Sequence, residues 1–122
     1  MTFKRILGIF IFLLFTTSCF HAHRHALPAG LARDSIIDKE TMVHLLADIH
    51  IQEAALQVMQ NRNPNIRKEI VSSYNGLFSK YGVSAKRFRL NLDYYRYDGD
   101  EFVKMYENVV KEIESRKNSL KP

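Results

Sequence analysis

The chain has 122 residues, 46% of them hydrophobic, and its 18 basic and 13 acidic side chains give a formal net charge of +5. This length allows one small domain with a single core and excludes a second domain of similar size. The basic residues are scattered among acidic ones, so the composition gives no support to nucleic acid as a partner.

The first nineteen residues predict a secretory signal that ends at the only cysteine, Cys19. Lys4 and Arg5 precede an uncharged apolar run over residues 6–15, and Thr16-Thr17-Ser18 stands before the cysteine. A ten-residue helix spans about 15 Å, about half the thickness of bilayer hydrocarbon. A segment that is inserted and then cleaved therefore fits better than a permanent transmembrane helix.

The cleavage region resembles that of bacterial lipoproteins, whose cysteine is lipidated and becomes the first residue of the mature chain. Ser18 fits the usual pattern, whereas Thr16 stands where Leu is typical. A single cysteine in an exported chain forms no internal disulfide, and its place at the end of the apolar run favours modification. The alternative is an ordinary cleaved signal with an incidental cysteine nearby. We predict a signal over residues 1–18 and a membrane anchor through lipidated Cys19.

Residues 19–34 are predicted to be a tether, because Pro28 and Gly30 interrupt them and they lack a helical apolar period. Three histidines alternate along the tether and would point the same way in an extended chain. They are weak candidates for a metal site, which Arg24 between them disfavours, or they form a spacer that becomes more basic as the pH falls through about 6.5. These histidines are His21, His23 and His25.

Four helices are predicted in the domain over residues 35–122. Helical apolar spacing and capping residues place them over about 38–61, 64–81 and 84–97, and from the Asp98-Gly99-Asp100 break to about 117. Asp38 and Ser84 are the expected N-caps, and Gly82 the left-handed C-terminal cap. No stretch alternates with period two, so we predict an all-α fold, a small bundle of four helices with short connections.

The first of these helices is apolar on two sides, which predicts a central helix packed on both flanks. One apolar stripe consists of Met42, Leu45, Leu46, Ile49 and Leu56, and the other of Val43, Ala47, Ile51, Ala54 and Val58.

Two polar seams lie between those stripes, His50 with Glu53 and Gln57, and His44 with Asp48 and Gln52. Each places an imidazole and a carboxylate on one face, as a metal ligand pair or a general base requires. Two ligands do not complete a zinc site, and no nucleophile accompanies them. The alternative is that the seams are solvated or pack across helices onto tyrosine hydroxyls and basic side chains. We predict no catalytic residue and no cofactor.

Aromatic and basic residues gather on the third predicted helix, at Tyr94, Tyr95 and Tyr97 and at Arg87, Arg89 and Arg96. Exposed Tyr and Arg together are typical of a binding hot spot for protein or sugar polymer. The competing interpretation places the tyrosines at the edge of the core with their hydroxyls in water.

Three stretches of the domain carry a family likeness, KETMVHLLADIHIQEAAL (39–56), residues 73–84, and FRLNLDYYRYDGDEFVKMYENVV (88–110). On these stretches the domain resembles a family of small Bacteroidota lipoproteins catalogued as domain of unknown function 4296. The family tends to have Asn-Pro where Asp98-Gly99 stands here, and because Asp caps helices well the helix start should survive. The resemblance implies a lipid-anchored, helical, envelope-facing domain with no established reaction.

We therefore expect a non-enzymatic, membrane-tethered module whose partner is another envelope protein. The alternative is a small-ligand or metal carrier that uses His50, Glu53 and Gln57 or the tether histidines. Lipoproteins of that phylum bound for the cell surface often carry acidic residues after the cysteine, whereas residues 20–24 are basic here. This contrast predicts an anchor that faces the periplasm.

Overall fold

The computed structural model describes residues 27–120. They form a short 3₁₀ turn, η1 (Arg33–Ser35), and four helices, α2 (Lys39–Arg62), α3 (Arg67–Lys80), α4 (Ala85–Arg96) and α5 (Gly99–Ser119), with no strand in this range. The predicted all-α bundle of four helices is confirmed. The predicted signal, Cys19 and the tether histidines lie outside the described residues.

Side-chain caps start three of the four helices. The side chains of Asp38, Ser84 and Asp98 accept hydrogen bonds from backbone N–H groups three residues ahead, at 2.8, 3.1 and 3.1 Å. Each bond satisfies a donor that the first helical turn leaves without a partner. Gly82 has a φ of +59°, the left-handed conformation expected after α3.

The connection between α2 and α3 is longer than predicted, because α3 begins at Arg67 and not at Pro64. The Asn63 side chain accepts a hydrogen bond from the Asn65 N–H at 3.0 Å, which holds the chain in a local turn after Pro64. Ile66 then enters the core with 3% exposure and accepts the first helical hydrogen bond.

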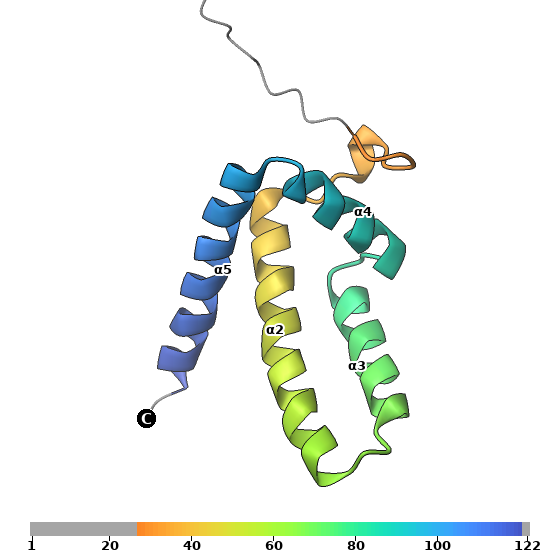
Figure 1. The fold of residues 1–122 in the computed structure, drawn as a ribbon, viewed down its shortest axis with the longest axis vertical. Helices are drawn as coiled ribbons and strands as arrows, with labels where there is room; N and C mark the ends of the chain where they lie inside the picture. The colour runs from red at the N-terminus through yellow and green to blue at the C-terminus, as the bar shows by residue number, and fades with distance from the viewer. Residues whose placement is uncertain (1–26, 121–122) are drawn as a thin grey trace, which may run out of the picture.

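The helices α5, α2 and α3 lie side by side with α2 in the middle, and α4 lies across one end of this layer (Figure 1). α3 returns antiparallel to α2, whereas α5 runs in the same direction as α2. The segment before α2 lies beside α4, and the α2–α3 connection is at the opposite end of the molecule (Figure 1). Within residues 27–120, none of the helices combines the length and apolarity that crossing a membrane requires.

The first apolar stripe of α2 is buried at all five positions. Four of its residues pack in two clusters, Met42 and Leu46 with Met105 and Val109 of α5, and Leu45 and Ile49 with Leu77 of α3. The predicted central position of this helix is therefore confirmed for the half that both neighbours cover.

The second stripe of α2 is covered only at its beginning, so the prediction of packing on both flanks is wrong for the rest. Val43 and Ala47 join the core, but Ile51 and Val58 are 41% and 52% exposed. The reason is the length of α5: its Arg116 reaches Asp48, and the helix ends at Ser119. The last turns of α2 therefore have no neighbour on that side among the described residues.

Candidate functional site

Asp48 stands at the centre of a polar network that joins α2 to both of its neighbours. One carboxylate oxygen accepts hydrogen bonds from Lys80 Nζ and the Tyr81 hydroxyl, each at 2.7 Å, and the other accepts one from Arg116. The Asp48 side chain is 13% exposed. Burial by itself would raise the pKa of Asp48, but the hydrogen bonds and the Arg116 charge outweigh it and lower the pKa.

Arg116 extends this network along α5. Its Nε donates to Glu112 at 2.8 Å, and the same carboxylate lies 3.1 Å from Nδ1 of His44. The hydrogen bond from Arg116 lowers the pKa of Glu112, so the pair stays charged at neutral pH. His44 and Asp48 are thus both held by residues of α5, and their seam is a helix-to-helix contact.

The seam of His50, Glu53 and Gln57 is also used between helices, but only in part. His50 Nδ1 lies 3.4 Å from Glu53, and Nε2 lies 3.4 Å from the Tyr106 hydroxyl on α5. The Tyr74 hydroxyl of α3 donates to Glu53 at 2.9 Å. Gln57 does not join them, since its amide donates to Asn61 within α2. Asp48, His50 and Glu53 thus pack onto tyrosine hydroxyls and basic side chains, which is one of the interpretations that the sequence left open, whereas Gln52 and Gln57 do not.

These contacts give neither seam the arrangement of a metal centre. No group of three His, Cys, Asp or Glu side chains converges on one point within residues 27–120. His50 and Glu53 remain 40% and 49% exposed, so a third ligand would have to come from outside the described part of the chain.

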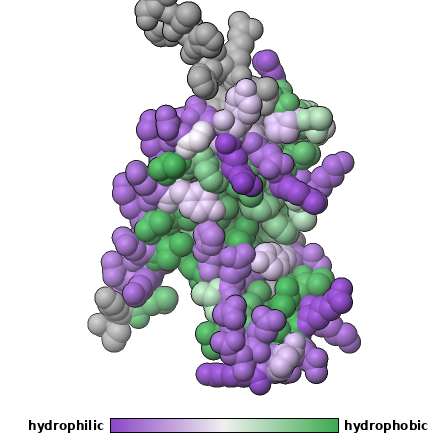
Figure 2. Space-filling view, viewed as in Figure 1, coloured by the Kyte–Doolittle hydropathy of each residue, from purple (hydrophilic) through white to green (hydrophobic). Residues whose placement is uncertain are grey.

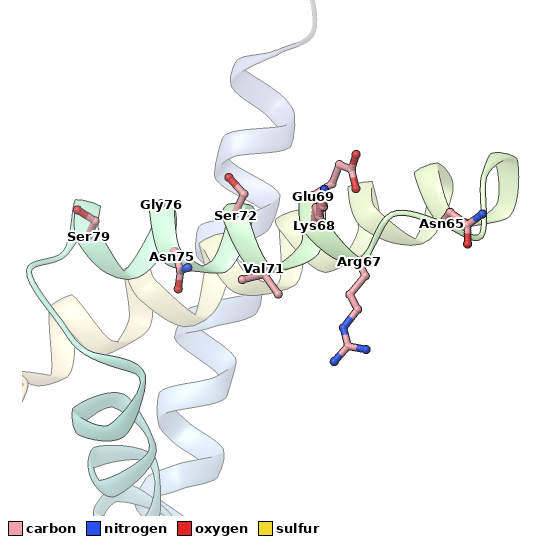
Figure 3. A pocket seen from close by; sticks show the side chains of 9 residues that line it. All are labelled: Asn65, Arg67, Lys68, Glu69, Val71, Ser72, Asn75, Gly76 and Ser79. Carbon is pink, nitrogen blue, oxygen red and sulfur yellow. The ribbon is translucent and has the colours of Figure 1, made fainter.

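A depression along α3 is too open to serve as a ligand pocket. Its nine lining residues come from α3 and from Asn65 just before it, and their side chains fan outward from a single helix (Figure 3). A site for a small molecule buries most of the ligand surface, which one helix does not achieve.

The exposed side of α5 carries an apolar surface, which we call the α5 patch and which consists of Phe102, Val103, Tyr106, Glu107 and Val110. Val103 and Val110 are 58% and 51% exposed and lie two turns apart on one face. Hydrophobic surface shows between hydrophilic side chains along the side where α5 lies (Figure 2).

The tyrosines and arginines of α4 divide between internal and surface positions. The Tyr95 hydroxyl donates to the Ile37 carbonyl at 2.6 Å, and Arg87 Nε donates to the Ser35 carbonyl at 2.9 Å. Burial first, and then Tyr94 and Asp38, raise the pKa of Tyr95 to about 12. Tyr94 packs edge-on against Tyr95, and Tyr97 is 61% exposed.

Asn91 is the residue of this region that the sequence did not single out. Its side chain is fully buried, accepts a hydrogen bond from the Ile37 N–H at 2.7 Å, and donates to the carbonyls of Ser35 and Arg87. Its position on the same face as Phe88, Leu92 and Tyr95 was the available signal, since a buried amide requires partners. The partners of Asp48 were also missed, and only the four-residue spacing of Glu112 and Arg116 hinted at them.

The fold and the contacts define a small all-α bundle whose ionisable side chains join helices. Residues 34–119 match the family described as domain of unknown function (DUF4296), and the chain belongs to this family. Comparison with curated proteins and with solved structures gives no match.

Proposed function

We propose that the chain is a lipid-anchored lipoprotein of the bacterial envelope and that its helical domain is a non-enzymatic module that binds another protein. The binding role is supported by the contrast between the ionised side chains of α2, which are paired inside the bundle, and the apolar side chains of α5, which face outward. Asp48 and Glu53 of α2 are held by hydroxyl and basic groups of neighbouring helices, while Val103 and Val110 of the α5 patch project outward. Contiguous exposed apolar surface is typical of interaction sites.

The chemistry of the α5 patch suits a protein partner. Phe102 and Tyr106 pack against each other with tilted rings whose centroids are 4.9 Å apart, and Val103 and Val110 stand beside them. Aromatic side chains beside aliphatic ones supply contact area with little loss of side-chain entropy. Glu107 is the one charged residue in the patch, so a partner with an apolar surface and a basic neighbour would complement it.

The anchor is supported by the sequence before the domain. The basic start, the short apolar run and the single cysteine at its end form a pattern typical of lipoprotein signals. The family resemblance suggests a Bacteroidota source, and the basic residues 20–24 favour a domain that faces the periplasm. Protease treatment of intact cells tests the orientation: the domain should survive until the outer membrane is opened, and its degradation in intact cells would contradict a periplasmic location.

The carrier hypothesis retains one favourable observation, which is that His50 and Glu53 are adjacent and partly exposed. It predicts that zinc or copper binding by the protein falls when His50 is replaced by Ala, or when the three tether histidines are replaced together. Equal binding by the wild type and both variants would end this alternative.

Site-specific photo-crosslinking in cells tests the binding role. A photoreactive amino acid at Val103 or Val110 should capture the same envelope protein repeatedly, because both positions lie on the α5 patch. The control position is Val71 on α3, which is 55% exposed and so matches them in exposure. Recovery of the chain alone from both patch positions, or the same partner from the control, would refute a role for this surface.

A further inference from the structure

We infer that the outward face of α4 lies against the membrane and contacts the headgroups of anionic lipids. This inference rests on the proposed anchor at Cys19. It concerns a surface distinct from the α5 patch, and it follows from where the chain enters the domain and from the charge of the helix at that point.

The chain that leads toward Cys19 is fixed to α4. Arg87, Asn91 and Tyr95 lie one turn apart along this helix, and all three bond to the backbone of residues 35–37. Leu31, a little earlier in the chain, is 6% exposed and so belongs to the packed domain. The point at which the chain leaves the domain is therefore held beside α4, at the end of the molecule opposite the α2–α3 connection (Figure 1).

The length of chain before Leu31 limits which surfaces reach the membrane. Leu31 stands twelve positions after Cys19, and the chain between them spans at most about 40 Å when fully extended. The 24 residues of α2 extend for about 36 Å between the two ends of the molecule. The α2–α3 connection therefore reaches the lipid only with the tether almost fully extended, whereas α4 reaches it at any shorter extension.

The charge of α4 complements an anionic surface. This helix carries four basic side chains and one acidic one, Asp93, in twelve residues. α5, by contrast, has five acidic and four basic side chains. Three of the basic residues of α4 are exposed, and none of the ion pairs recorded for residues 27–120 involves this helix. The exposed residues are Lys86, Arg89 and Arg96.

Two further features suit a lipid surface. Tyr97 stands at the end of α4 with 61% exposure, and tyrosine is enriched at membrane interfaces, where its ring and hydroxyl meet different surroundings. Cationic side chains gain attraction to anionic lipid within about one Debye length of the surface, a distance that a nearby anchor makes accessible.

The experiment couples the mature chain, residues 19–122, to vesicles through Cys19, the only cysteine, with a maleimide-bearing lipid. One set of vesicles is phosphatidylcholine, and the other also contains phosphatidylglycerol. Phenylglyoxal then modifies exposed arginines, and mass spectrometry gives the modification rate at each site. We expect the rates at Arg89 and Arg96 to fall about threefold or more on the anionic vesicles, and to recover in about 0.5 M NaCl.

Arg62 and Arg67 at the far end serve as internal controls and should keep their rates. Equal protection at both ends, or no protection at Arg89 and Arg96, would overturn the inference. A second readout is hydroxyl-radical oxidation of Tyr97, which the anionic vesicles should slow. Arg89→Glu with Arg96→Glu should restore that oxidation, whereas the matched charge reversal Arg67→Glu with Lys68→Glu should not. If the first double variant fails to fold by circular dichroism, the wild-type arginine rates alone decide.

The chemical coupling separates this inference from the proposed function. It replaces lipidation in the cell, so unprotected arginines would refute the orientation of α4 while leaving the anchor at Cys19 intact. Protected arginines together with an unlipidated Cys19 in cells would instead refute the anchor and preserve the lipid affinity of α4.

Discussion

Asn91 and Ile37 are 54 positions apart in the chain, yet the Asn91 side-chain oxygen accepts a hydrogen bond from the Ile37 N–H at 2.7 Å. Both residues are buried, at 0% and 3% exposure. The Asn91 amide also donates to the Ser35 carbonyl at 3.1 Å and to the Arg87 carbonyl at 2.9 Å. One amide therefore satisfies the buried Ile37 N–H and two partly buried carbonyls, and it attaches the entry segment of the domain to α4.

Replacement of Asn91 by Ala should lower the free energy of unfolding by about 2–4 kcal/mol, because it leaves the buried Ile37 N–H without an acceptor and opens a small void. Urea unfolding followed by circular dichroism measures the change. Asn108→Ala on the exposed side of α5 is the matched control and should change stability by less than about 0.5 kcal/mol. Equal effects of the two substitutions would contradict the role of Asn91.

Replacement of Asp48 by Asn should lower the free energy of unfolding by about 1–2 kcal/mol near neutral pH, because it removes the carboxylate that Lys80, Tyr81 and Arg116 share. The folded-state pKa of Asp48 lies below the ordinary aspartate value of 3.8. Its stabilisation is therefore present above that value and is lost as the pH falls through the lower folded-state pKa.

Urea unfolding of the wild type and Asp48→Asn across acidic pH tests this sign. The difference in stability between the two proteins should be constant above a pH of about 5 and should shrink below about 4. Asp93→Asn on the exposed face of α4 is the control. A difference that grows toward low pH would show that Asp48 does not act through its ionised form.

The raised pKa of Tyr95 predicts that the protein loses stability at alkaline pH. Burial raises its pKa to about 12 from the ordinary tyrosine value of 10.0. A raised folded-state pKa means that its contribution is complete below pH 10.0 and is lost as the pH rises toward about 12. Tyr95→Phe should remove the highest step from the ultraviolet titration of the tyrosines. The substitution should also cost about 1 kcal/mol at neutral pH through the lost bond to Ile37. A titration that is unchanged above about pH 11 in Tyr95→Phe would contradict the assignment of the highest tyrosine pKa to Tyr95.

Val103→Asp with Val110→Asp should leave stability within about 0.5 kcal/mol of the wild type, since both side chains are more than half exposed. With the photoreactive amino acid placed at Glu107 of the same patch, this double variant should no longer capture the partner, because the two introduced charges must be desolvated on binding. The control is Val71→Asp, at a comparably exposed position on α3. Loss of the partner with the control as well would indicate a general effect on the protein.

The local features of this fold were predictable because they depend on residues close in sequence. Apolar spacing indicated the four helices, and Asp38, Ser84 and Gly82 marked their ends correctly. The late start of α3 was not predictable from Pro64 alone, since it depends on a specific bond between the Asn63 side chain and the Asn65 N–H.

The features that escaped prediction are set by how helices far apart in sequence align. The seam residue Asp48 was visible as a polar position, but its partners Lys80 and Arg116 lie 32 and 68 positions away. The bare end of α2 follows from where α5 stops beside it, which periodicity within one helix does not report. Asn91 looked like an ordinary helical residue because its partners belong to a segment without regular apolar spacing.

Fatty-acid labelling of Cys19 tests the central claim of a lipid anchor most directly. Cells that produce the chain are grown with an alkyne-bearing fatty acid, and the label on the purified protein is measured for the wild type and Cys19→Ser. We predict a labelled wild type in the membrane fraction and an unlabelled Cys19→Ser variant that is absent from it or retains its uncut signal. Wild-type protein that carries no label, or equal label on Cys19→Ser, would contradict the account.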